Sequence, residues 1–364
     1  QGSIMSYCLE VVRQDLTQSR ISTLPGERDL QLAPGEALVR VDRFGLTANN
    51  ITYGVAGDII GYWQFFPAEA EWGRIPVWGT GTVIDPGTSD LNPDAVYYGY
   101  FPMASYLTVK PEHVTERGFT DGASHRAQLP PVYNQYQLAT PENGFAEGTL
   151  DHRMVFFPLF ATGFVLDDYL DDNAFFGADA VIISSASSKT SFSLAFLLHH
   201  HRDCKVIGLT SRTNKAFVES MGIYDQVVTY DDIESLHSDT NIAFIDMAGN
   251  SSVTARVHHH FDRRCVCSSG VGITHWESRD GENPATLPGA RHTMFFAPDQ
   301  IQKRNKEWGP ETYQHKMNDA WGQFLESVDQ WVSISHYEGA EAMNQAYQEV
   351  LSGAAPNKGY VIVL

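Results

Sequence analysis

Residues 177–195 read GADAVIISSASSKTSFSLA, and this stretch decides the fold class. Its short apolar run AVII predicts a buried strand, and the run FSLAFLLHHH that begins at Phe192 predicts a helix. Further buried runs, KVIGLTS at 205–211 and IAFIDMAG at 242–249, occur in alternation with segments of helical character. Buried strands that alternate with crossover helices predict a parallel, doubly wound sheet.

The earlier part of the chain has a different pattern, in which short strands are separated by glycine and proline. EALVRVDRF at 36–44 alternates apolar and polar residues, and PVWGTGTVIDPG at 76–87 predicts a strand pair broken by Gly79, Gly81 and Pro86. Short strands of this kind favour a small β-barrel. Residues 119–150 are rich in Pro, Gly, Gln and Tyr without periodicity, which predicts a lid or an insertion.

The order of these patterns predicts an α/β protein of two domains. We expect residues 5–150 to form the first domain and residues 151–331 to form the doubly wound domain. The final residues, 332–364, predict a strand, a helix and a last strand that return to the first domain. Residues 1–4 are expected to lie outside the fold.

Composition limits the partners of the chain. It has 25 Lys and Arg residues against 44 Asp and Glu residues, a formal net charge of −19. This charge argues against nucleic acid as a partner, because phosphate backbones bind positive surfaces.

No apolar run approaches the roughly 20 residues that span a membrane, and no leader pattern is present, so we expect neither membrane binding nor secretion. Four cysteines do not make a disulfide framework, and the expected location is cytoplasmic. A homodimer stays open.

A dinucleotide in a doubly wound sheet binds where the first strand meets its helix, because the helix N-terminus offers free N–H groups and a positive dipole end. The three usual glycine positions fall on Ser185, Ser188 and Ser191. Serine restricts positive φ and close backbone approach, for which the charge of Lys189 could compensate. The alternative is a polar turn in which serine caps the helix. The candidate phosphate ligands are Ser185, Ser187, Ser188, Lys189 and Thr190.

The second strand ends in GLTSRTNK at 208–215. A site for NAD would place Asp or Glu there, whereas the 2′-phosphate of NADP needs positive charge and hydroxyl donors. The sequence therefore predicts NADP(H) as the cofactor, with a solvated helix start as the alternative. The candidate ligands of the 2′-phosphate are Thr210, Ser211, Arg212 and Lys215.

The order of these blocks resembles the zinc-free quinone reductase and enoyl reductase branch of the medium-chain dehydrogenase/reductase superfamily. EALVRVDRFGLTANNITYGVAG at 36–57 is similar to the early strand and active-site loop of that branch, and AYQEVLSGAAPNKGYVIVL at 346–364 is similar to its closing helix and strand. The resemblance implies a GroES-like β-barrel catalytic domain beside a Rossmann-type nucleotide domain. The chain departs from the family in lacking all three phosphate-loop glycines.

The resemblance also implies site residues. Tyr53 corresponds to the tyrosine of the quinone reductase loop and is expected to donate a proton, while Asn49 and Asn50 could hydrogen-bond the same carbonyl. The alternative is that Tyr53 is a packed aromatic and that the asparagines are turn residues. SSGVG at 268–272 resembles the loop that flanks the nicotinamide. The candidate residues beside the nicotinamide are Thr162, Ser268 and Gly270.

The segment GYWQFFPAEAEW at 61–72 holds more aromatic residues than a solvated loop needs. We expect it to line a pocket for a small apolar carbonyl substrate, and a second core under the lid is the alternative. The candidate pocket residues are Tyr62, Trp63, Phe65, Phe66 and Tyr133.

The chain lacks the cysteine spacings that hold zinc, and the histidine runs 199–201 and 258–260 point their side chains in different directions, so no metal is expected. The leading hypothesis is an enzyme that uses NADPH to reduce an enone, quinone or ketone, with a proton from Tyr53 or solvent. One alternative is an NADP-binding sensor without catalytic activity. Another is a non-redox enzyme that uses an interdomain cleft.

Overall fold

The computed structural model describes residues 5–272 and 283–364, so the expectation for residues 1–4 lies outside the described part. The chain divides into two compact units. Unit 1 consists of the chain up to Val155 together with Ser333–Leu364, and unit 2 consists of Phe156–Val332. The change from one unit to the other falls inside a single helix, α3 (Leu150–Asp172).

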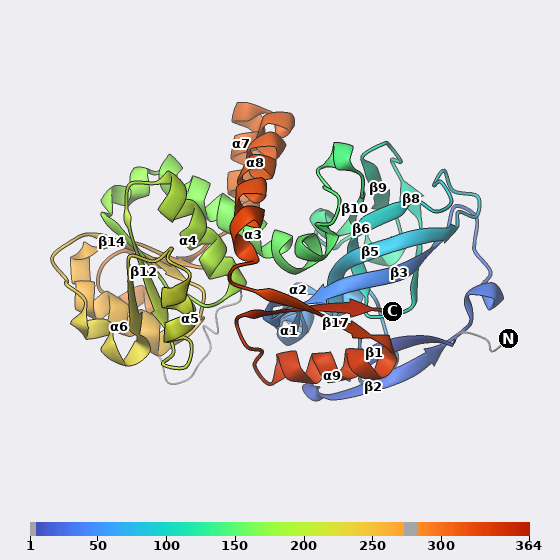
Figure 1. Ribbon diagram of the computed structural model, residues 1–364, viewed down its shortest axis with the longest axis horizontal. Helices are drawn as coiled ribbons and strands as arrows, with labels where there is room; N and C mark the ends of the chain where they lie inside the picture. Colours follow the sequence, from blue (N-terminus) through green and yellow to red (C-terminus); the bar gives the residue numbers. More distant parts are fainter. Residues whose placement is uncertain (1–4, 273–282) are drawn as a thin grey trace. The chain divides into compact units, whose positions relative to one another are not determined.

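Unit 1 is built on a sheet of nine strands among the described residues, with β3 (Ala37–Leu46), β5 (Pro76–Asp85) and β6 (Val96–Pro102) at its centre. Figure 1 shows these three strands side by side. The expected break at Gly79 and Gly81 is wrong, because β5 is one continuous strand that pairs with both neighbours. A Cβ at Gly79 would lie 2.4 Å from the carbonyl oxygen of Arg43, so glycine permits the close approach of β3.

The same sheet takes in two short stretches of residues 119–150, the segment that the sequence predicted to be a lid or an insertion. Residues 135–138 form β10 (Gln135–Leu138), which pairs antiparallel with β6 and with β9 (Gly118–Asp121). The buried guanidinium of Arg126 fixes the intervening turns, with a 2.9 Å ion pair to Asp121 and a 2.6 Å hydrogen bond to the carbonyl oxygen of Tyr133. The segment therefore contains short strands that its sequence did not reveal, because strands of four residues are too short to show a periodicity.

A second sheet in unit 1 has the order β2-β1-β4 in the described chain. It joins the larger sheet through a 2.9 Å hydrogen bond from the backbone N–H of Leu9 to the carbonyl oxygen of Met103. The other strands of unit 1 are β1 (Ser6–Val12), β2 (Asp15–Leu24), β4 (Trp72–Gly73), β7 (Tyr106–Val109), β8 (Pro111–Glu112), β17 (Ser333–Glu338) and β18 (Lys358–Val363), and its shorter helices are α1 (Ala48–Val55), α2 (Gly57–Ile60) and α9 (Gly339–Leu351).

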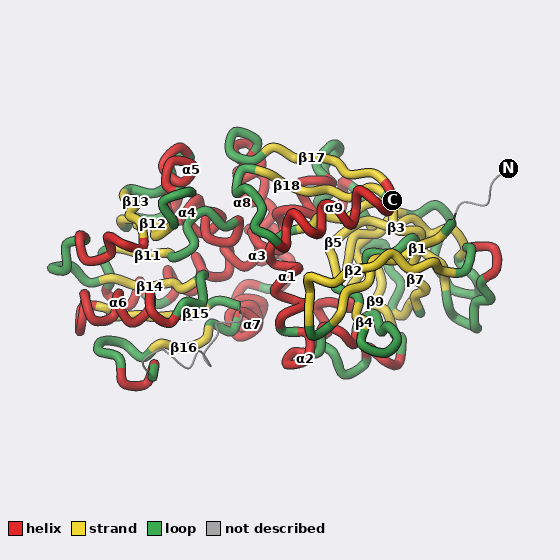
Figure 2. Tube along the Cα trace, turned by 90° about the horizontal axis from the view of Figure 1, so that it is seen from below, coloured by secondary structure: helices red, strands yellow, loops and turns green. Residues whose placement is uncertain are grey.

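Unit 2 contains a parallel sheet of six strands within the described residues, in the order β13-β12-β11-β14-β15-β16, which Figure 2 shows from one edge to the other. In chain order this arrangement is 3-2-1-4-5-6, the doubly wound topology of dinucleotide-binding domains. The predicted fold class is confirmed. The elements are β11 (Ala180–Ile183), β12 (Lys205–Thr210), β13 (Gln226–Thr229), β14 (Ile242–Asp246), β15 (Cys265–Gly270), β16 (His292–Met294), α4 (Lys189–His201), α5 (Lys215–Ser220), α6 (Ser251–Phe261), α7 (Ala297–Trp308) and α8 (Pro310–Val328).

The strands of unit 2 form because their apolar side chains are buried on the sheet. Ile182, Leu209 and Phe244, from three neighbouring strands, pack with Val257 of α6 in one buried cluster. The helices of the described chain include none that is both long and apolar enough to cross a membrane.

Candidate functional site

Helix α1 carries the residues expected to act in catalysis. It begins after Thr47, whose backbone N–H donates to the side-chain oxygen of Asn50 at 2.8 Å, as in a capping box. The amide nitrogen of Asn50 donates to the carbonyl oxygen of Pro76 at 3.2 Å. The oxygen of the Asn50 amide therefore caps α1, while its nitrogen ties α1 to β5, so both ends of this amide are used within unit 1.

Tyr53 lies on the same helix with 7% of its surface exposed. Its hydroxyl oxygen accepts a 3.2 Å hydrogen bond from the indole N–H of Trp78. Burial raises the pKa of the Tyr53 phenol to about 12, and side-chain hydrogen bonds from Trp78 and Asn49 oppose the rise. The phenol is therefore protonated at neutral pH and can donate a hydrogen bond.

Aromatic rings surround Tyr53 within unit 1. Its ring centroid lies 4.6 Å from that of Tyr62 and 6.4 Å from that of Tyr133, and the hydroxyls of Tyr62 and Tyr133 are 3.2 Å apart. The predicted pocket residues Phe65 and Phe66 belong to the same aromatic cluster. Trp63 makes no ring contact with this cluster in the described structure. Four of the five predicted pocket residues thus meet around the predicted proton donor.

Sequence reasoning missed other members of the aromatic cluster. Trp78 on β5 stands opposite Tyr100 on β6, and its ring stacks at 5.8 Å on that of Tyr98. The hydroxyl of Tyr98 is buried without a hydrogen-bond partner in the described chain. The buried guanidinium of Arg153 lies 5.7 Å from the Tyr98 ring centroid. The alternation in VYYGYFP places Tyr98 and Tyr100 on one face, and this signal could have found them.

In unit 2, the turn between β11 and α4 is the candidate phosphate loop. Ser185 has a φ of +48°, in the left-handed region, and its N–H donates to the hydroxyl of Tyr230 at 2.9 Å. The Ser188 hydroxyl caps α4 by accepting the backbone N–H of Ser191 at 3.3 Å. Burial lowers the pKa of the Lys189 ammonium to about 8. Ser188 therefore performs the capping role of the alternative interpretation, while Lys189 supplies a desolvated charge.

The structure brings this loop together with the end of the second strand. The Asn214 amide donates to the Ser187 hydroxyl at 3.2 Å, and the Asn214 backbone N–H donates to the Ser211 hydroxyl at 3.3 Å. Thr210, at the end of β12, is buried. Because β11 and β12 are parallel neighbours, their carboxyl ends meet at one edge of the sheet, where doubly wound domains bind ligands.

The positive charges predicted for the 2′-phosphate lie on the surface. The guanidinium of Arg212 pairs with Asp231 at 2.9 Å, and the ammonium of Lys215 lies 3.9 Å from the carboxylate of Glu219. The Arg212 side chain is 80% exposed. Exposed ion pairs contribute little, so these side chains can exchange their carboxylates for a phosphate at small cost.

The residues predicted beside the nicotinamide have different surroundings. Ser268 is buried, and its hydroxyl lies 2.7 Å from Nε2 of His258 and 2.6 Å from Nδ1 of His292. Burial lowers the pKa of His292 to about 4. The Ser268 hydroxyl thus belongs to a buried network. Gly270 ends β15 at the carboxyl edge of the sheet.

Two further predicted residues lie on helices of unit 2. The Thr162 hydroxyl donates to the carbonyl oxygen of Pro158, one turn earlier in α3, at 3.3 Å. Thr190 is in the first turn of α4, next to Lys189. Both are partly buried.

A family model and several solved structures match this chain. The model of the family described as "Protein of unknown function (DUF2855)" matches residues 44–356. The chain belongs to the DUF2855 family. No curated protein sequence matches it significantly.

Solved structures share the fold of this DUF2855 chain along their whole lengths. The quinone oxidoreductase from Coxiella burnetii is 14% identical with a TM-score of 0.55, and the match covers 99% of each chain. CurA from Vibrio vulnificus is 13% identical, with a TM-score of 0.60 over 98% of each chain. The yhdH oxidoreductase from Salmonella enterica, in complex with NADP, is 14% identical with a TM-score of 0.54, covering 98% of this chain and 99% of that one. The DUF2855 chain therefore has the fold of the medium-chain dehydrogenase/reductase superfamily, as the sequence predicted.

In residues 5–272 and 283–364, no three His, Cys, Asp or Glu side chains are grouped so that they could hold a metal ion. Burial raises the pKa of the Cys265 thiol to about 12 and that of Cys267 to about 11. Both thiols are thus protonated at neutral pH.

Proposed function

We propose that this chain is an NADPH-dependent reductase of an enone, quinone or ketone that works without zinc. The strand order of unit 2 supports a dinucleotide site, because the ends of β11 and β12 meet where such folds bind their cofactor. The shared fold of the yhdH oxidoreductase, which was solved with NADP, supports the choice of cofactor.

The residues of unit 2 fit the phosphates of NADP(H). Lys189 begins α4, where free N–H groups and the helix dipole favour an anion, and a phosphate would offset the burial that lowers the pKa of its ammonium. Ser187 would add a hydroxyl donor to the pyrophosphate. Arg212 and Lys215 would take the 2′-phosphate in place of their present carboxylates.

One observation about Tyr53 supports a reductase most directly. The indole N–H of Trp78 can only donate, so the Tyr53 oxygen is the acceptor in the hydrogen bond between them. The phenolic hydrogen is therefore left for a different acceptor. Asn49 and Tyr100 also interact with this hydroxyl, and a substrate carbonyl oxygen is the acceptor that a reductase would present in their place. When bound, NADPH supplies the hydride. Tyr53 would hydrogen-bond the carbonyl oxygen and give it a proton as negative charge develops there.

The proposal is tested by cofactor binding followed by turnover. NADPH should bind more tightly than NADH in a fluorescence titration, and loss of NADPH absorbance should follow addition of a benzoquinone, a linear enone or a ketone. Tyr53→Phe is expected to lower kcat by about 100-fold or more and to leave the NADPH affinity unchanged. Tyr97→Phe is the matched control, since this buried tyrosine packs on Phe119 away from Tyr53.

Two outcomes would contradict parts of the proposal. Normal turnover by the Tyr53→Phe variant would assign the proton to solvent. Failure of the unaltered protein to bind NADPH would overturn the function as a whole.

An NADP-binding sensor is the second candidate, and one observation favours it. The rings of Tyr62, Tyr100 and Tyr133 pack around Tyr53, which leaves its side chain only 7% exposed. A cluster packed in this way leaves little room for a substrate beside the phenol. NADPH binding without turnover of any carbonyl class would favour the sensor.

A further inference from the structure

The ring of Tyr133 lies on the outside of the aromatic cluster around Tyr53. Its centroid is 4.7–6.4 Å from those of Tyr53, Tyr62, Phe65, Trp78 and Tyr100. Four of these five residues are at most 8% exposed, whereas Tyr133 is partly exposed and the neighbouring Val132 is 64% exposed. Tyr133 therefore separates the Tyr53 phenol from solvent on this side of the cluster.

Trp78 is also partly exposed, but its position is fixed. It lies on β5, which is paired with β3 on one side and with β6 on the other, and its indole N–H donates to Tyr53. The Tyr133 side chain is held only by ring contacts and by a 3.2 Å hydrogen bond between its hydroxyl and that of Tyr62. A substrate can replace contacts of this kind, because a hydrogen bond between neutral groups contributes little net free energy.

The backbone that carries Tyr133 is anchored. Its carbonyl oxygen accepts a 2.6 Å hydrogen bond from the buried guanidinium of Arg126, and its N–H donates to the carbonyl oxygen of Pro130 at 3.2 Å. Arg126 in turn forms a buried 2.9 Å ion pair with Asp121. We therefore expect the ring of Tyr133 to move by rotation of its side chain, without movement of the backbone.

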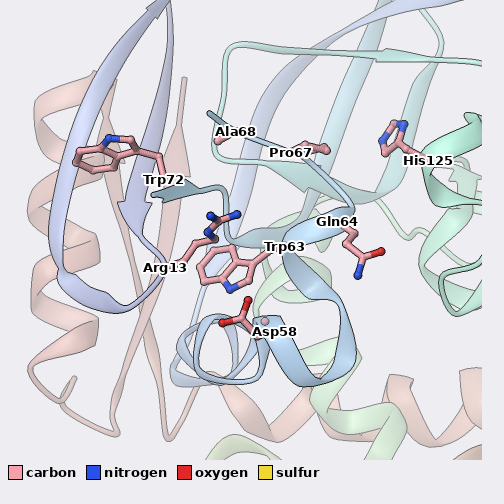
Figure 3. Close-up of a pocket in the computed structure, with 9 residues that line it drawn as sticks. Arg13, Asp58, Trp63, Gln64, Pro67, Ala68, Trp72 and His125 are labelled. Carbon is pink, nitrogen blue, oxygen red and sulfur yellow. The ribbon is translucent and has the colours of Figure 1, made fainter. Parts of the chain in front are cut away.

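The backbone of Tyr62, on the other side of the hydroxyl pair, is anchored by the next residue. The indole of Trp63 is enclosed by two glycines: a Cβ at Gly57 would lie 2.1 Å from the indole nitrogen, and a Cβ at Gly73 would lie 2.5 Å from the six-membered ring. Figure 3 shows this indole beside Asp58, on the wall of a hollow that lies outside the aromatic cluster. Tyr62 is itself 8% exposed, so Tyr133 is the member of the pair that can turn outward.

We propose that Tyr133 is a specificity-determining residue, whose ring turns outward to admit the substrate carbonyl to Tyr53 and limits the size of the group that this carbonyl carries. The inference rests on the proposed function, since it needs a substrate that reaches Tyr53. The closed cluster leaves little room beside the phenol, and rotation of one ring frees the face of Tyr100 on which Tyr133 is stacked. The rotated ring still lines the entrance, because its backbone stays in place.

The test compares two matched pairs of substrates, benzoquinone with phenylbenzoquinone and methyl vinyl ketone with phenyl vinyl ketone. Tyr133→Ala should raise kcat/KM for the larger member relative to the smaller by about tenfold or more, because the ring that lines the entrance is removed. Tyr133→Phe keeps the ring and loses the hydrogen bond, so it should leave this ratio unchanged. It should raise kcat/KM for both members by about two- to tenfold, as the open form becomes more populated.

Tyr106→Ala is the matched control. Tyr106 is another partly exposed tyrosine of unit 1, whose hydroxyl donates to the carbonyl oxygen of Pro25 at 2.9 Å, and its replacement should leave the ratio unchanged. Melting temperatures show whether each variant is folded.

The outcomes separate this inference from the proposed function. Absence of turnover by the unaltered protein would contradict both. Turnover by the unaltered protein together with the same ratio in Tyr133→Ala would contradict this inference alone, as would an equal change of the ratio in Tyr106→Ala. If Tyr133→Ala does not fold, Tyr133→Phe decides, and a kcat/KM no higher than that of the unaltered protein overturns the inference.

Discussion

Ser185 adopts a backbone conformation that glycine would adopt without strain. Its φ of +48° places the Cβ against its own backbone, at a cost of roughly 1–2 kcal/mol for a side chain of this kind. The position is the first of the three at which dinucleotide-binding turns usually have glycine. Ser185 therefore adopts the left-handed backbone conformation at this position although it lacks the conformational freedom of glycine.

Replacing Ser185 by glycine should increase the free energy of unfolding. We expect a gain of about 0.5–1 kcal/mol, since the strain is relieved while the unfolded chain gains some freedom. Chemical denaturation measures the change. Ser185→Ala is the matched control, because it keeps the Cβ and should bring no gain, and equal stability of the glycine and alanine variants would refute the argument.

Lys189 is expected to make the proposed binding of NADPH depend on pH. Its pKa of about 8 is below the ordinary 10.5, so the unfolded chain holds more protons between these values and stability should rise with pH across that window. Phosphate binds the protonated amine, and the NADPH affinity should therefore fall as the pH rises above about 8. Titrations of NADPH at a series of pH values measure this dependence.

Two variants separate the charge of Lys189 from its size. Lys189→Arg stays charged and should bind NADPH without this pH dependence, whereas Lys189→Met should bind about ten- to hundredfold more weakly at neutral pH. Unchanged affinity in the methionine variant would remove Lys189 from the phosphate site.

At the scale of elements, β5 depends on glycine for its place in the sheet. A Cβ at Gly79 would meet the Arg43 carbonyl oxygen at 2.4 Å and the Phe44 Cβ at 2.8 Å, and neither can move without shifting β3. Gly79→Ala should therefore lower the free energy of unfolding by about 1–3 kcal/mol in thermal or chemical denaturation.

The control for Gly79 lies in helix α8. A Cβ at Gly322 would meet nothing within 4 Å, and alanine favours helix, so Gly322→Ala should raise stability by about 0.5–1 kcal/mol. If both alanine variants changed stability in the same direction, the close approach of β3 and β5 would not explain the glycine.

For the whole molecule, the proposed chemistry needs no metal. Elemental analysis of the purified protein should find no stoichiometric zinc, and chelators should leave its melting temperature and turnover unchanged, because the sequence lacks the spacings that hold zinc. Zinc bound by any two of the four cysteines would contradict this prediction.

The sequence by itself determined the doubly wound unit. The runs that became β11, β12 and β14 are strongly apolar and separated by helices, and right-handed crossovers leave few ways to arrange such an order. It predicted Tyr53 in a loop and Lys189 in the turn before a helix that begins at Phe192, whereas the structure has Tyr53 in α1 and Lys189 at the start of α4. Helices α7 and α8 and the short strands β9 and β10 were not anticipated, since their local signal is weak.

Only the tertiary structure decided what the side chains touch. Trp78, Tyr98 and Tyr100 joined the aromatic cluster because antiparallel register sets Trp78 opposite Tyr100, and register depends on pairing between distant segments. The hydroxyl of Ser268, on β15, hydrogen-bonds with His258 of α6 and His292 of β16. Spacing along the chain fixes which face of an element a residue occupies, whereas its neighbours are fixed by contacts between elements that are far apart in the sequence.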